Sequence, residues 1–199
     1  MRRYMVMAAA LLAAPSVMLA ATTYTIDPAH STAQFKVRHM MVSNVTGDFG
    51  NMSGTITYDP ADPSKSSVEA VIDTTSIDTR QPNRDEDLKS PNFFDVAKFP
   101  AITFKSKKVE RAGEGKLKVT GDLTMKGVTK EVVLDVEGPS PEVKDSRGNV
   151  KSGASATTKL KRLEFGITWN PTLDGGGVVV GDDVAITIEI EMKKQQPAG

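Results

Sequence analysis

Apolar and polar residues alternate with a period of two along most of this chain, and this pattern restricts the fold more than any other feature. In VAITIEIEM, residues 184–192, every second residue is apolar, from Val184 to Met192. The segments KLKVTGDLTMK (116–126) and AQFKVRH (33–39) show the same pattern. Because successive side chains of a β-strand point to opposite faces, each segment predicts a strand with one apolar face.

Weaker alternation marks further segments, and Gly, Pro, Asn or Asp residues separate most of them as hairpins require. These segments are MSGTITY (52–58), SSVEAVIDT (66–74), ITFKSKKV (102–109), KEVVLDVE (130–137) and SATTKLK (155–161). Eight or nine strands of this kind predict an all-β protein, either an antiparallel barrel or a sandwich.

The first 21 residues, MRRYMVMAAALLAAPSVMLAA, have the pattern of a secretory signal peptide. Arg2 and Arg3 precede an apolar run, and the small residues Ala20 and Ala21 follow where a signal peptidase would cleave. The run is short for a permanent membrane helix, although a retained anchor is the alternative. We therefore expect a periplasmic protein with no permanent membrane anchor. We also expect one domain over residues 22–193 and a flexible tail over residues 194–199.

Charge and cysteine content exclude several classes of function. The chain has 25 basic and 25 acidic residues, and removal of the leader with its two arginines leaves 23 against 25. A nearly neutral chain without a basic block is not expected to bind nucleic acid. The chain contains no cysteine, which excludes disulfides, zinc–thiolate sites and thiol nucleophiles.

The only two histidines, His30 and His39, raise the question of catalysis or metal binding. Asp27, His30 and Ser31 are crowded together, but adjacent side chains diverge along the backbone and no Gly-x-Ser-x-Gly turn is present. We interpret residues 27–31 as a turn that leads into a strand. The two histidines match no metal-binding motif, with completion by distant carboxylates as the alternative. We therefore predict no catalytic residues, no metal ligands and no cofactor.

Residues 81–100, QPNRDEDLKSPNFFDVAKFP, interrupt the alternation. Asn83 is predicted to cap a short helix with acidic residues in its first turn, and Ser90 and Pro91 are predicted to end it. Three phenylalanines follow, at positions 93, 94 and 99. Because such a segment must bury its aromatic rings, it either plugs one end of a barrel or lines the mouth of a cavity. We favour the plug.

The order of several segments resembles the YceI-like family, a lipocalin-like group associated with polyisoprenoid binding. The similar segments are YTIDPAHSTAQFKVRHMMVSNVTGDF (24–49), SSVEAVIDTTSIDTRQPNRDEDLKSPNFFDVAKFPAITFKS (66–106), GDLTMKGVTKEVVLDVE (121–137) and FGITW (165–169). The resemblance implies an eight-stranded antiparallel β-barrel with a short helical insertion and a long apolar pocket. It also implies a polyisoprenoid or isoprenoid-quinone-like lipid as ligand, a periplasmic location and often a homodimer.

The chain departs from the family pattern at two positions in the helical insertion. Many relatives carry histidine where this chain has Asp87, and aspartate where it has Asn92. A contact between that histidine and the head group of a ligand is therefore not implied here.

The residues predicted to face into the barrel are candidates for the wall of a ligand pocket. His39 shares its parity with Phe35 and Val37, so we expect it to face the interior near a strand end. There it would be either a hydrogen-bonded core residue or a polar contact for a ligand. Trp169 is predicted to close the barrel end or to lie at the pocket mouth. The complete candidate set is Phe35, Val37, His39, Met52, Ile56, Phe93, Phe94, Phe104, Leu117, Val119, Leu123, Trp169, Ile186 and Ile188.

Three hypotheses follow for the function. The leading one is a periplasmic binding or carrier protein that holds a long amphiphilic lipid in an apolar barrel, without catalysis. The second is an enzyme that acts on an amphiphile in the same pocket, with His39 or His30 as general base. The third is a structural or stress-response barrel filled by its own side chains. An open or a packed interior distinguishes the third hypothesis from the first two.

Overall fold

The structure is a computed structural model that describes residues 21–196. Its strands are β1 (Thr22–Ile26), β2 (Thr32–His39), β3 (Ser43–Phe49), β4 (Met52–Tyr58), β5 (Ser67–Asp73), β6 (Ile77–Asp78), β7 (Ala101–Gly113), β8 (Lys116–Met125), β9 (Val128–Glu137), β10 (Val143–Lys144), β11 (Val150–Lys161) and β12 (Val180–Lys194). Its helices are α1 (Pro82–Lys89) and the short 3-10 helices η1 (Pro63–Lys65), η2 (Thr74–Ser76) and η3 (Arg162–Phe165). Among residues 21–196, none of these helices is long and apolar enough to cross a membrane.

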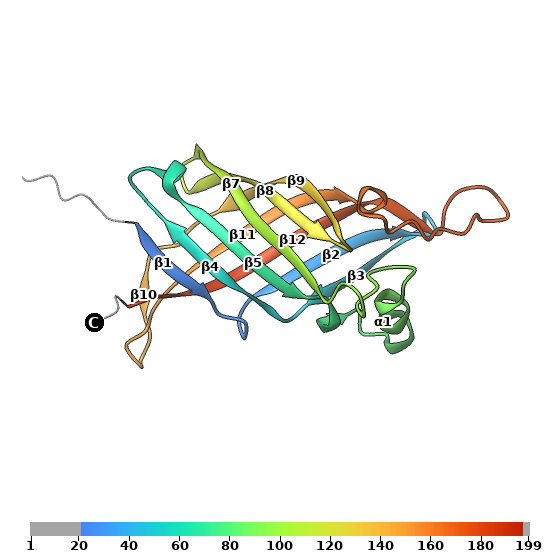
Figure 1. Cartoon of the computed structure of the whole chain (residues 1–199), viewed down its shortest axis with the longest axis horizontal. Coiled ribbons are helices and arrows are strands. Elements are labelled where there is room, and N and C mark those ends of the chain that lie inside the picture. The colour runs from blue at the N-terminus through green and yellow to red at the C-terminus, as the bar shows by residue number, and fades with distance from the viewer. Residues whose placement is uncertain (1–20, 197–199) are drawn as a thin grey trace, which may run out of the picture.

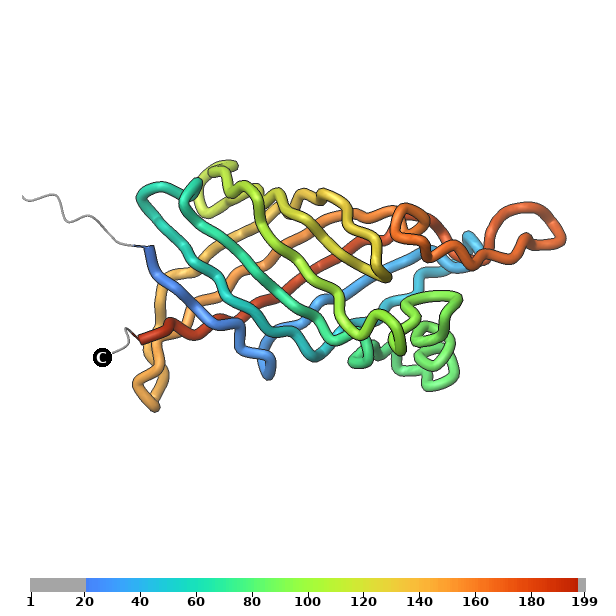
Figure 2. Tube along the Cα trace, viewed as in Figure 1, coloured from blue at the N-terminus to red at the C-terminus, as the bar shows by residue number. Residues whose placement is uncertain are grey.

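Eight strands close into an antiparallel barrel in the order β11, β9, β8, β7, β5, β4, β1 and β12. Closure comes from β11 and β12, which pair continuously from Lys151 opposite Lys193 to Lys161 opposite Asp183. Figure 1 shows an elongated barrel whose strands run obliquely to its long axis, and the trace in Figure 2 follows the same path. The predicted eight-stranded antiparallel barrel with a short helical insertion is confirmed.

Strand β12 is long enough to pair with two successive strands along one of its edges. Its C-terminal end pairs with β1, where Ile26 lies opposite Met192, and its remainder pairs with β2, where His39 lies opposite Val180. The β2–β3 hairpin therefore extends the wall beyond β1 toward the end of the barrel that carries α1 (Figure 1). These two ends of the molecule are called the β10 end and the α1 end below.

The chain termini lie partly outside the described residues. The predicted leader, residues 1–21, is outside them except for Ala21. At the other terminus, β12 continues to Lys194 and the Gln195 N–H donates to the carbonyl of Thr23 at 2.8 Å. Strand pairing therefore passes the predicted domain boundary at residue 193, and residues 197–199 of the predicted tail lie outside the described part of the chain.

Helix α1 begins at Pro82, two residues before the start that an Asn83 cap predicts. Gln81, not Asn83, is the N-cap, and its side chain accepts hydrogen bonds from the N–H groups of Asn83 and Arg84. Pro82 occupies the first helical position, where its fixed φ and missing N–H are no disadvantage. The prediction that Asn83 caps the helix was therefore wrong. The helix ends before Ser90, as predicted.

The aromatic segment after α1 covers the α1 end of the barrel. Phe94 packs edge-on against Phe49, with ring centroids 5.5 Å apart. Phe49 belongs to the buried cluster that includes Phe165, and Phe94 packs against that cluster. Phe93 lies 5.3 Å from Trp169, ring centroid to ring centroid. The segment thus combines both predicted roles, because Phe94 closes the end of the core while Phe93 faces the opening beside Trp169.

Candidate binding cavity

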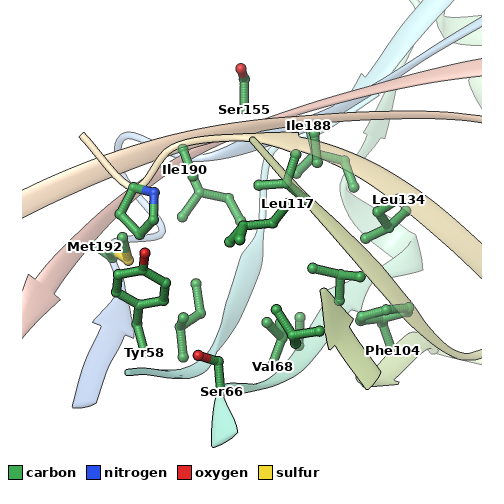
Figure 3. A pocket seen from close by; sticks show the side chains of 18 of the residues that line it. Tyr58, Ser66, Val68, Phe104, Leu117, Leu134, Ser155, Ile188, Ile190 and Met192 are labelled. Carbon is green, nitrogen blue, oxygen red and sulfur yellow. The ribbon is translucent and has the colours of Figure 1, made fainter. Parts of the chain in front are cut away.

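An apolar cavity, called the inner cavity, occupies the half of the barrel toward the β10 end. It has an empty volume of about 1010 Å³, its open ends included. Figure 3 shows side chains from several strands, among them Tyr58, Leu117 and Ile190, gathered around this space. Its lining is almost wholly apolar and includes Met52, Ile56, Tyr58, Val68, Ala70, Phe104, Leu117, Val119, Leu134, Ile190 and Met192. The alternation of the strands therefore produces a space with apolar walls, because every second side chain of each strand points inward.

A second apolar cavity, called the outer cavity, lies toward the α1 end and has an empty volume of about 920 Å³, space open to solvent included. Four side chains line both cavities: Ile72, Ile102, Leu123 and Ile188. The two spaces therefore meet at this ring of aliphatic residues. Phe93 and Phe94 from the segment after α1 contribute to the outer wall.

Two glycines keep aromatic rings against the wall of the barrel. Gly47 lies directly opposite Phe35 on the neighbouring strand, and a Cβ at Gly47 would lie 2.6 Å from the Cζ of that ring. A Cβ at Gly121 would lie equally close, 2.6 Å, to the Cζ of Phe104. Any larger residue at either position would push the ring away from the backbone that it covers. The sequence analysis did not single out these glycines, although a glycine inside a predicted strand can mark the close approach of another group.

A more polar hollow, called the mouth, opens at the α1 end next to the outer cavity. Five residues line both spaces: Phe35, Val37, Leu88, Phe93 and Val180. The other side chains of the mouth are mostly polar or aromatic and include Arg38, His39, Gln81, Arg84, Asp87, Asn92 and Trp169. The lining thus changes from almost wholly apolar in the inner cavity to a mixture of apolar and polar side chains at the mouth, as the tail and head group of an amphiphile require.

Arg84 is fixed at the mouth by a buried threonine. Its Nε donates to the hydroxyl of Thr79 at 2.8 Å, and its Nη2 donates to the carbonyl of the same residue at 2.9 Å. Asp85 accepts from the N–H of Thr79 at 2.9 Å and from its hydroxyl. The first turn of α1 is therefore tied to the strand segment before it, and the guanidinium is held where it lines the mouth.

Arg162 organises the backbone on the other side of the mouth. Only 4 % of this residue is exposed, and burial lowers the pKa of its guanidinium. Its Nη1 donates to the carbonyls of Ile167 and Trp169, at 2.6 and 3.0 Å. Its Nε and Nη2 donate to the carbonyls of Gly181 and Val180, at 2.9 and 3.0 Å. One side chain therefore joins the segment that carries Trp169 to the start of β12.

The sequence-predicted site residues all line one of these three spaces. The inner cavity includes Met52, Ile56, Phe104, Leu117 and Val119, and the ring between the cavities includes Leu123 and Ile188. The outer cavity includes Phe94 and Ile186, the outer cavity and mouth share Phe35, Val37 and Phe93, and the mouth alone includes His39 and Trp169. Contact of these residues with a ligand stays a prediction. Sequence reasoning missed Arg84 and Arg162, since an arginine next to a predicted strand or in a short helix is usually solvent-exposed.

The residues that suggested a catalytic triad lie on the outside of the barrel. His30 Nδ1 lies 3.1 Å from Asp27 Oδ2, but Ser31 turns away and its hydroxyl bonds both the carbonyl and the N–H of Glu191. The N–H groups of Ala29 and His30 bond Asp27 instead. This is the predicted turn into a strand, and it is not the geometry of a triad.

The same cluster brings together the three side chains most suited to hold a metal ion among the described residues, Asp27, His30 and Glu191. Lys151 already contacts both carboxylates, with its Nζ 3.3 Å from Asp27 Oδ2 and in contact with Glu191 Oε1. The bond from His30 is the main cause that lowers the pKa of Asp27, and the Glu191 carboxylate raises the pKa of Lys151. The cluster is therefore an ion-pair network in which an ammonium group holds the place that a cation would take.

Comparison with known proteins assigns the chain to a family. A sequence model of the YceI-like domain matches residues 24–192. The chain belongs to the YceI-like family. It is 37 % identical over 170 residues to a UPF0312 protein of Staphylococcus aureus strain USA300, a match that covers 85 % of this chain and 96 % of that protein.

Two solved structures share the fold of this YceI-like protein. The crystal structure of BcnA from Burkholderia cenocepacia superposes with a TM-score of 0.71 at 25 % sequence identity, and the match covers 83 % of this chain and 98 % of BcnA. A polyisoprenoid-binding domain from Saccharophagus degradans superposes with a TM-score of 0.62, covering 87 % and 99 % of the two chains. The sequence identity to this domain is only 16 %, so the comparison shows that the two proteins share a fold and nothing more.

Proposed function

We propose that this protein binds one long isoprenoid lipid, a polyisoprenoid or an isoprenoid quinone, and carries it without chemical change. The observation that carries the proposal is the pair of apolar cavities that meet at a shared ring of aliphatic side chains and adjoin a mouth where polar side chains join the apolar ones. In this arrangement the tail lies along the cavities and the head group lies among the polar side chains of the mouth. The polyisoprenoid-binding domain from Saccharophagus degradans, which has the same fold, supports this choice of ligand.

The energetics favour a long hydrocarbon tail in these cavities. Each methylene group that leaves water contributes roughly 0.8 kcal/mol, so several isoprene units give tight binding without a strong polar contact. The inner lining carries no ionisable side chain apart from Tyr58. A charged head group would therefore lose its hydration there without gaining an oppositely charged partner, so it is expected to stay at the mouth.

The rival hypotheses have less support from the geometry. A barrel filled by its own side chains is disfavoured because the described interior contains two cavities. An enzyme that uses His30 is disfavoured because that residue lies in the surface ion-pair network and outside the cavities and mouth. His39 lines the mouth, so it is the residue to test for any chemistry on a bound head group.

The expected setting is the periplasm, where a lipid carrier without a permanent membrane anchor moves cargo between membranes. The leader pattern over residues 1–21 and the membership in the YceI-like family support this setting. A homodimer is part of the same proposal, on the basis of the family resemblance. Sedimentation of the purified protein tests the dimer separately from ligand binding.

Native mass spectrometry of the protein isolated from its own periplasm tests the proposal directly. The expected result is a complex of each chain with one isoprenoid lipid that organic solvent releases. Titration of the delipidated protein with isoprenoid quinones should restore the complex. Absence of bound lipid together with no uptake of quinone would refute the proposal. Loss of any quinone turnover in His39→Ala, with binding retained, would favour the enzyme hypothesis instead.

A further inference from the structure

We propose that the turn between β2 and β3 is a membrane-docking tip, through which the protein touches a phospholipid bilayer while lipid enters or leaves the mouth. The tip consists of Met40, Met41 and Val42. This inference rests on the proposed function, because a water-insoluble cargo has to be collected from a membrane. It adds a site and a partner that ligand binding by itself does not require.

The tip exposes three consecutive apolar side chains. Met40 is 44 % exposed, Met41 is 55 % exposed and Val42 is 77 % exposed. Turns between strands normally carry small or polar residues, and an exposed group of large apolar residues commonly marks an interaction site. Met40 and Met41 also adopt positive φ values of 48° and 61°, a backbone conformation that is uncommon for residues other than glycine and asparagine.

Hydrogen bonds hold the tip in place. The N–H of Met40 donates to the carbonyl of Val179 at 2.7 Å, which joins the tip to the residue before β12. The N–H of Val42 donates to the carbonyl of His39 at 3.1 Å, and Nη2 of Arg38 donates to the carbonyl of Met41 at 3.0 Å. Because the backbone is fixed in this way, the apolar side chains project outward without first ordering a flexible loop.

The tip lies at the mouth of the cavity. Arg38, His39 and Val179, which flank the tip or bond it, all line the mouth. Figure 1 shows that the β2–β3 turn and the segment between η3 and β12 project from the same end of the barrel. That segment contains Trp169 and Val178, which are also exposed. Tryptophan favours the interface between hydrocarbon and water, so its place beside the mouth fits contact with a bilayer.

The size of the tip favours a membrane over a second protein molecule. A stable protein–protein interface uses roughly 20–30 residues and about 800 Å² on each partner, whereas the tip offers three side chains at the end of a hairpin. Insertion into a bilayer needs no complementary surface, because hydrocarbon accepts any apolar shape. Arg38 lies at the base of the tip, at the depth where its guanidinium would meet lipid phosphates.

The chain provides a matched control for the test. The tip variant is Met41→Asp combined with Val42→Asp, since aspartate tolerates positive φ and its charge opposes entry into hydrocarbon. The control is Val143→Asp, which changes an exposed valine, 66 % accessible, in β10 at the opposite end of the barrel. Thermal unfolding of the three proteins checks that each variant remains folded.

Vesicles of phosphatidylethanolamine and phosphatidylglycerol that contain an isoprenoid quinone supply the assay. Flotation measures binding to the vesicles, and the rate of quinone transfer measures loading. In parallel, each protein is loaded with the same quinone from detergent micelles. We expect the tip variant to bind vesicles and to load from them about tenfold more weakly or slowly than wild type. Val143→Asp should match wild type, and loading from micelles should be equal in all three proteins.

The outcomes separate this inference from the proposed function. Loading of the tip variant from vesicles at the wild-type rate would overturn the docking tip and leave the proposed function intact. A tip variant that sediments as a monomer while the wild type is a dimer, with vesicle loading unchanged, would assign the tip to a second copy of the chain and also overturn it. If wild type binds no quinone from vesicles or micelles, the proposed function fails, while flotation of empty vesicles still decides whether the tip binds a bilayer.

Discussion

The two ends of the barrel are held together by different chemistry. At the β10 end, charged side chains join strands that are far apart in the sequence. Tyr24 donates to Glu142 at 2.7 Å, and the same carboxylate pairs with Lys194 at 2.9 Å. At the α1 end, Arg162 bonds four backbone carbonyls, and three exposed apolar residues, Leu163, Trp169 and Val178, lie in the same part of the chain.

Because of this difference, we expect a ligand to enter the barrel at the α1 end. The charged side chains at the β10 end are paired with one another, and Val143 is a single exposed valine there. The α1 end has the polar mouth, the aromatic pair Phe93 and Trp169, and the apolar tip. We therefore infer that the tail of the ligand passes the mouth first and reaches Tyr58 last.

The largest expected effect comes from Arg162→Met, which removes the donors for four carbonyls in a buried place. We expect the free energy of unfolding to fall by about 3–5 kcal/mol, because unpaired buried polar groups are costly. The matched control is Arg111→Met, since Nη2 of Arg111 donates to the exposed carbonyl of Pro60 at 3.1 Å. That change should cost less than about 1 kcal/mol. Equal effects in urea unfolding would show that Arg162 does not organise the α1 end.

A comparison of two phenylalanines separates the packed core from the wall of the cavity. Phe165 is 1 % exposed within the core cluster of the α1 end, so Phe165→Ala should cost at least about 3 kcal/mol. Phe104 lines the inner cavity and lies against Gly121. Phe104→Ala should cost about half as much, because one side of its ring already faces empty space. Calorimetry of the delipidated proteins measures both, and an equal cost would indicate a packed interior.

The smallest effect is a dependence on pH at the β10 end. The hydroxyl of Tyr24, followed by Lys194, lowers the pKa of Glu142 below its ordinary value of 4.5. The ionised carboxylate therefore stabilises the fold above that value, and the stabilisation is lost as the pH falls through the lowered pKa. Glu142→Gln should cost less than about 1 kcal/mol at neutral pH. Urea unfolding of both proteins should show that this difference disappears in acid, and a difference that grows in acid would contradict the assignment.

The strands and the direction of their side chains could be predicted from the sequence, because alternation is a local pattern. Residues 184–192 are an example, since their apolar face reappears in the lining of both cavities. The pairing of β12 with both β1 and β2 could not be predicted, because it joins residues that are far apart in the sequence, such as Ile26 with Met192 and Ala33 with Ile188. The alternation left a barrel and a sandwich open, and the closed eight-stranded barrel was implied only by the family resemblance. The order of the strands around it was not predicted.

The candidate site, too, could be predicted only in part from the sequence. The parity of β2 correctly placed Phe35 and Val37 on the cavity side, whereas His39 lies at the mouth because the hairpin extends past the end of the barrel. The tip depends on a bond from Met40 to Val179, which lies far away in the sequence. The carbonyl partners of Arg162 are closer in the sequence, at positions 167, 169, 180 and 181. No local sequence pattern identifies an arginine that bonds backbone carbonyls, because every residue type carries a backbone carbonyl.

The path of the tail through the barrel is tested most directly by a series of isoprenoid quinones with increasing tail length. Ala70 lines the inner cavity, and its neighbour Val71 is exposed on the outside of the same strand. Ala70→Trp should fill the inner cavity, and Val71→Trp is the control for the added ring. For wild type and Val71→Trp, we expect affinity to rise with each isoprene unit until the tail reaches the end of the inner cavity. For Ala70→Trp the affinity should stop rising at a shorter tail. An affinity that does not depend on tail length, or that changes equally in both variants, would contradict binding along the barrel.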